Sequence, residues 1–81
     1  MSSYAETLPH VFEVLKPYAR GHELHENTDL VTHLGIDSMQ AMEILLEAEE
    51  RLDISIPLNV LASVRTVRDF TLQLQQLTSQ R

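Results

Sequence analysis

Apolar residues recur at helical spacing in three segments of the 81-residue chain. From Leu8 to Ala19 they form one stripe at three- and four-residue intervals, which predicts an amphipathic helix with one buried face. From Ser38 to Asp53 nearly every residue favours helix, so we expect the strongest helix there. A third apolar stripe runs from Val67 to Leu77. Between them, Pro57 ends regular structure, and Leu58–Ala62 can form a short helical turn.

Two positions compete for the start of the first helix. Ser3 and Glu6 have the spacing of a capping box, but Pro9 would then lie inside the helix, where it removes a hydrogen bond and clashes. A cap at Thr7 places Pro9 in the first turn, where its missing N–H costs nothing. We therefore predict a start capped at Thr7, before which a separate N-terminal turn can form, with Pro17 weakening the helix near its end.

The later helix starts carry their own capping signals. Asp37 with Gln40 resembles a capping box, and Thr66 with Asp69 repeats the spacing. Before the first of these pairs lies a long connection, Arg20–Asp37, of a length that is uncommon in compact domains and often functional.

Three apolar residues within the long connection, Leu30, Val31 and Leu34, are expected to hold it against the core. With no repeat and no linker, we predict a single domain over residues 1–81. Its fold class is all-α: a small bundle of three main helices and one short one, with a long loop between the first two main helices.

The apolar residues of the second helix fall on two sides at about 100° per residue. The expected core side holds Ala41, Ile44, Leu45, Ala48 and Leu52. The opposite side holds Met39, Met42 and Leu46, with Glu43 and Glu50 among them and Glu47 and Glu49 at the margins. Flexible apolar side chains ringed by carboxylates are typical of a docking surface. The alternatives are that the long loop covers this second stripe or that its exposure has no function.

Charge narrows the choice of partner. The chain has 6 Lys and Arg against 12 Asp and Glu, a formal charge of −6, whereas nucleic-acid binding requires a cationic surface. Residues 37–53 alone carry six acids and one base, a local charge of −5. We therefore expect partners with basic docking patches and no nucleic acid.

Other features of the sequence argue against cysteine-dependent sites, secretion and membrane insertion. There is no cysteine, so disulfides, thiolate metal sites and thiol nucleophiles are excluded. The first residues lack the basic and apolar pattern of a secretory signal, and no apolar run approaches the roughly 18 residues needed to span a bilayer. We expect a cytoplasmic monomer that does not insert into membranes.

The histidines suggest two further kinds of site, a metal site and a hydrolase triad. His22 and His25 are three residues apart, whereas the zinc-protease helix pattern needs its histidines four apart, so we expect no metal. A Ser38–His33–Asp37 hydrolase triad is disfavoured, because adjacent Asp37 and Ser38 cannot readily flank one imidazole in relay order.

Several of these features occur together in "TDLVTHLGIDSMQAMEILLEAEERLDISIP" and the later "TVRDF". From about Thr28 to Phe70 the chain resembles the acyl carrier proteins: an apolar loop residue, Leu-Gly-x-Asp-Ser, an acidic helix, Asp-Ile-x-Ile-Pro and the start of a last helix. The Asp-Ser pair alone is a weak motif. The ordered set, at this spacing and chain length, is a strong one.

The resemblance implies a carrier, not an enzyme. Ser38 matches the serine that bears 4′-phosphopantetheine, which comes from coenzyme A and holds acyl groups as thioesters, and Asp37 matches the residue that helps to position the site. Met39, Met42, Glu43, Leu46 and Glu50 match the helix gripped by partners, and Glu49 lies beside them. The implied partners are a phosphopantetheinyl transferase and the enzymes that load and process acyl groups.

The chain departs from the family pattern at a few positions. Met39 stands where leucine is usual, Leu52 where an aromatic is frequent, and Ser55 where an acid is common. These differences leave fatty-acid, polyketide and related secondary-metabolite pathways open. Asp37 favours an acyl carrier over a peptidyl or aminoacyl carrier. The alternative from another class is a small helical adaptor that uses the same acidic Met/Leu patch without a prosthetic group.

Overall fold

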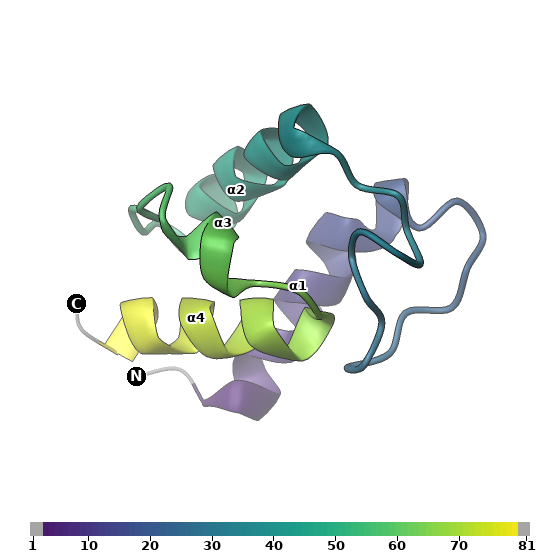
Figure 1. Cartoon of the computed structure of the whole chain (residues 1–81). Coiled ribbons are helices and arrows are strands. Elements are labelled where there is room, and N and C mark those ends of the chain that lie inside the picture. The colour runs from purple at the N-terminus through teal and green to yellow at the C-terminus, as the bar shows by residue number, and fades with distance from the viewer. Residues whose placement is uncertain (1–2, 80–81) are drawn as a thin grey trace.

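A computed structural model describes residues 3–79, and these form the expected helical bundle (Figure 1). Its elements are α1 (Tyr4–Leu15), a 3-10 helix η1 (Lys16–Tyr18), α2 (Ser38–Leu52), α3 (Val60–Ser63) and α4 (Val67–Ser79). Helix α1 crosses behind α4 in Figure 1 and packs against both α2 and α4. Within residues 3–79, no helix combines the length and apolar character that crossing a membrane requires.

The predicted start of α1 at Thr7 is wrong. Ser3 is the N-cap, and its side chain and that of Glu6 form the reciprocal capping box. Thr7 lies inside the helix, where it is buried and its hydroxyl donates to the Ser3 carbonyl oxygen at 2.9 Å. Pro9 is accommodated inside α1, since the two capping bonds and the buried Thr7 together offset the single helical hydrogen bond that proline cannot donate.

The end of α1 follows the expectation more closely. The α-helix stops at Leu15, and Pro17 lies in the tighter 3-10 turn that follows. Asp53 closes α2 in the left-handed conformation, with φ of 55°. The short helix α3 begins at Val60, two residues later than the expected turn.

The core is built mainly from α1, α2 and α4, with contributions from the long loop. Phe70, Leu15, Leu74, Val11, Val14 and Val67 are its largest fully buried apolar side chains. From the loop, Leu30 and Leu34 are buried as expected, and Ile36 joins them. The expectation for Val31 is wrong, because this side chain is 64% exposed while its two neighbours in the apolar set point inward.

Backbone hydrogen bonds tie the long loop to the start of α4. The Leu30 N–H donates to the Arg65 carbonyl oxygen at 2.9 Å, and the Val67 N–H donates to that of Thr28 at 3.1 Å. An isolated antiparallel bridge pairs Asp29 with Thr66 at the same place. The loop is therefore an ordered part of the bundle on both sides of this bridge.

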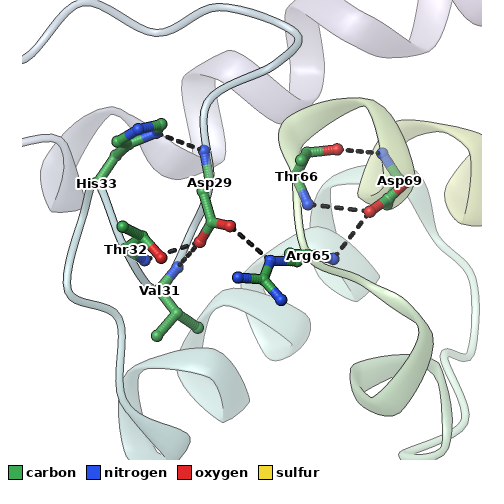
Figure 2. A network of polar contacts seen from close by, with 7 residues as sticks. All are labelled: Asp29, Val31, Thr32, His33, Arg65, Thr66 and Asp69. Atoms are coloured by element: carbon green, nitrogen blue, oxygen red, sulfur yellow. Dashed lines mark hydrogen bonds and ion pairs between the residues drawn. The ribbon is translucent and has the colours of Figure 1, made fainter.

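The Asp29 carboxylate is the centre of a polar network that joins the two segments (Figure 2). It accepts the backbone N–H groups of Val31 at 3.0 Å and Thr32 at 2.7 Å, and the Nε of Arg65 at 2.7 Å. The Thr32 N–H first, and then the Arg65 guanidinium, lower the pKa of Asp29 to about 2. This carboxylate is therefore ionised wherever the protein is studied near neutral pH.

Candidate functional site

Asp37 and Gln40 form the predicted capping box at the start of α2. The Asp37 Oδ1 accepts the Gln40 N–H at 2.8 Å, and the Gln40 Oε1 accepts the Asp37 N–H at 3.3 Å. Because Asp37 is the N-cap, Ser38 is the first residue of the helix and is not its cap. Its side chain is exposed, and among residues 3–79 the hydroxyl has no hydrogen-bond partner.

The segment before Ser38 explains how the helix start is held. Gly35 adopts φ of +66°, a left-handed conformation that glycine takes without strain. Ile36 is buried, and its N–H donates to the Leu30 carbonyl oxygen at 3.1 Å. The chain therefore turns at Gly35 and is anchored in the core at Ile36. It then leads outward to Asp37 and Ser38, which are both exposed.

The second apolar stripe of α2 is exposed in the structure. Met39 is 74%, Met42 44% and Leu46 60% exposed. On the other side Ile44, Leu45 and Ala48 are buried, whereas Ala41 and Leu52 are half-buried. The alternative that the long loop covers the second stripe is therefore wrong, and the helix presents an apolar surface to solvent next to Ser38.

Carboxylates flank the exposed stripe, but they are not equivalent. Glu43, Glu47 and Glu50 are exposed. Glu49 is half-buried, and its Oε2 accepts the Ile56 N–H at 2.8 Å. Glu49 therefore fixes the connection that follows α2. The sequence pattern did not indicate this hydrogen bond, because the bond depends on the path that the chain takes after Asp53.

Glu43 and Glu47, which flank the exposed stripe, lie near Tyr18 at the end of η1. Partial burial, and then the charges of Glu43 and Glu47, raise the pKa of the Tyr18 hydroxyl. Tyr18 is the last residue of η1. The structure shows it half-buried against the core and close enough to these two carboxylates to sense their charge.

A small apolar cavity of about 30 Å³ lies behind the first turns of α2. Its lining comes from the loop, α2, α3 and α4: Leu30, Ile36, Ala41, Ile44, Leu45, Val60, Leu61, Val64 and Phe70. This space is small and partly open to solvent, so holding a long acyl chain inside the bundle would require the lining elements to move apart.

The histidine positions do not form a reactive site with Ser38. His33 Nδ1 accepts the Asp29 N–H at 2.8 Å, and the Asp37 carboxylate accepts the N–H of Gln40. Both residues thus serve the backbone and not a relay to the serine. His22 and His25 line an open hollow with His33, and the part of the chain that the structure describes contains no group of three or more residues arranged to hold a metal ion.

Comparison with known proteins gives two matches. Residues 14–74 match the family described as "Phosphopantetheine attachment site". A probable acyl carrier protein of Caulobacter vibrioides (strain NA1000 / CB15N) is 39% identical over 56 residues, which is 69% of this chain and 65% of that protein. The similarity therefore covers less than two thirds of this relative. The family match spans all of α2 and α3 and the greater part of α4.

Proposed function

Because the chain belongs to the acyl carrier protein family of phosphopantetheine-binding domains, we propose that it is a carrier whose 4′-phosphopantetheine is attached to Ser38. Membership of this family implies the covalent group itself. When attached, the group supplies a thiol that holds acyl chains as thioesters, a function for which the cysteine-free chain has no side chain of its own. The protein then presents reactive groups to enzymes and is not itself an enzyme.

The observation that carries this proposal is the state of the Ser38 hydroxyl. It is exposed at the first position of α2, and Asp37 performs the capping that the serine would otherwise supply. A phosphodiester formed there would lie at a helix N-terminus, where the macrodipole and the first N–H groups favour negative charge. The residues present therefore fit the group in accessibility and in electrostatics.

The exposed stripe next to Ser38 supports a docking role. We define the docking face as Met39, Met42, Leu46, Glu43 and Glu50, with Glu49 at its edge. Apolar contact supplies affinity, and the carboxylates favour partners with basic patches. We assign two kinds of partner to this face: a phosphopantetheinyl transferase and the enzymes that load and process the acyl group. Glu49 contributes less, because its carboxylate already holds the Ile56 N–H.

The segment around α3 differs from α2 in charge, and this bears on the pathway. Residues 54–64 contain no charged side chain, so the segment around α3 offers enzymes much less charge than α2 does. We favour fatty-acid, polyketide-type or related secondary metabolism, with an acyl group and not an aminoacyl group as cargo. The mass of the thioester carried by protein from its native host would identify that cargo.

Intact mass spectrometry tests the attachment. The purified chain is incubated with a phosphopantetheinyl transferase, coenzyme A and magnesium. We expect wild type to gain the mass of one arm and Ser38→Ala to gain none, while Ser63→Ala, which changes a serine at the end of α3, behaves as wild type. A wild type that stays unmodified would contradict the carrier function and favour an adaptor that uses the docking face without a prosthetic group.

A further inference from the structure

Two of the three methionines in the chain lie together on the docking face. Met39 and Met42 are three residues apart on α2, so they are neighbours on one side of the helix. Their exposed fractions, 74% and 44%, leave both accessible to small molecules in solvent. The more exposed of these two methionines, Met39, directly follows Ser38 in the sequence.

Accessible thioethers react with peroxides, and the chemistry is balanced. The methionine sulfur attacks one oxygen of hydrogen peroxide, an S–O bond forms and the O–O bond breaks. The released hydroxide takes the proton from the oxygen that is now bonded to sulfur and leaves as water. Sulfur is oxidised by two electrons and the peroxide is reduced by two. The product is a polar, chiral sulfoxide, which methionine sulfoxide reductases convert back to the thioether.

We propose that Met39 and Met42 form a reversible oxidation site that controls access to Ser38. The inference rests on the proposed function, because it requires partners to grip the docking face. A sulfoxide oxygen placed in an apolar contact must be desolvated without a matched donor on the partner. Docking then weakens, although Ser38 itself is unchanged.

The fold should survive this oxidation. Neither methionine belongs to the buried core, which on α2 is made by Ile44, Leu45 and Ala48. A sulfoxide at Met39, which is 74% exposed, stays largely in water in the free protein, and one at Met42, which is 44% exposed, stays partly in water. Leu46, the remaining apolar side chain of the stripe, has no sulfur to oxidise, so the change is confined to the half of the docking face nearest Ser38.

The test uses the chain before the arm is attached, so that the thiol of the arm cannot consume the oxidant. Wild type and the double variant Met39→Leu/Met42→Leu are treated with hydrogen peroxide, freed of it and mapped by peptide mass spectrometry. Each is then given to a phosphopantetheinyl transferase with coenzyme A. The measured quantity is kcat/KM of arm transfer for the oxidised sample, divided by that of the same protein before oxidation.

We expect oxidation at Met39 to exceed that at Met42, and the kcat/KM ratio of wild type to fall about tenfold, as for one unpaired polar group in an apolar contact. Treatment with the two methionine sulfoxide reductases should restore it. The double variant should keep a ratio near one, which accounts for Met1 and for any unrelated damage. Circular dichroism should show an unchanged melting curve for oxidised wild type.

Two results would overturn the inference. One is an oxidised wild type that accepts the arm as fast as before. The other is an equal loss in the double variant, which would assign the effect to other residues. These outcomes differ from failure of the proposed function, in which wild type accepts no arm even before it meets peroxide.

Discussion

Leu45 and Leu46 are chemically identical neighbours on α2, yet the first is 4% and the second 60% exposed. Leu45 lies on the side that packs into the bundle and lines the small cavity. Leu46 lies on the docking face with Met39 and Met42. The same helix thus presents one apolar side to the core and another to solvent. The comparison indicates that apolar residues on a helix must be assigned by side and not by type.

The largest expected effect is on the free energy of unfolding, which should respond differently to truncation of these two leucines. Leu45→Ala removes buried methyl groups and enlarges a cavity, and should lower the free energy of unfolding by about 2–5 kcal/mol. Leu46→Ala removes an exposed side chain and should change it by less than about 0.5 kcal/mol. Urea denaturation followed by circular dichroism measures both. Equal losses would mean that both sides of α2 support the fold.

The next effect concerns charge on the docking face. Glu43→Lys should reduce kcat/KM of arm transfer about tenfold, because it places a cation opposite a basic partner patch. The matched control is Glu13→Lys, an exposed acid near the end of α1, which should have little effect. Raising the salt concentration should weaken wild type towards the level of the variant. A transfer rate that changes neither with Glu43→Lys nor with salt would mean that charge does not contribute to docking.

A pair of adjacent glutamates sharpens the boundary of the docking face. Glu49→Ala leaves the Ile56 N–H without its carboxylate partner and should cost about 1 kcal/mol of stability. Glu50→Ala removes an exposed carboxylate and should leave the free energy of unfolding almost unchanged. For kcat/KM of arm transfer the order should reverse, so that Glu50→Ala is impaired more than Glu49→Ala. Should Glu49→Ala impair transfer more than Glu50→Ala, Glu49 would belong to the docking face proper.

The smallest effect lies in the loop that supports Ser38. The pKa of Asp29 falls from the usual 3.8 to about 2 in the folded protein. The bound carboxylate therefore stabilises the fold above about pH 4, and this contribution is lost as the pH falls through the folded pKa. Asp29→Asn should be less stable than wild type at pH 7, and the gap should close towards pH 2. Thermal melts across this range test the prediction, and a gap independent of pH would contradict it.

Local patterns explain how much of the fold was predictable. The Asp37/Gln40 pair predicted the start of α2, because both partners of a capping box lie within one turn. The same logic holds for Ser3 and Glu6, although Pro9 lies inside the helix that this pair begins. Two capping hydrogen bonds and a buried threonine outweigh the penalty of that one interior proline.

Contacts between distant segments were not predictable in the same way. Arg65 reaches Asp29 across 36 positions, and no periodicity or capping rule links two such residues. The exposure of Val31 follows from the turn that Asp29 organises, so it depends on the same unforeseen network. For the candidate site, the exposed stripe was correctly predicted from helical periodicity. The bond between Glu49 and Ile56 was not, because it needs the path beyond Asp53.

We propose that the outer side of α2 serves partners and not the core, and the variant Met42→Ala distinguishes these two roles. Met42 is the least exposed apolar member of the docking face, at 44%, so it is the most demanding case. Unfolding free energy and kcat/KM of arm transfer are measured on the same preparation. We predict a stability change below about 1 kcal/mol together with a several-fold loss of transfer. A loss of 2 kcal/mol or more with normal transfer would place Met42 in the core and contradict the account.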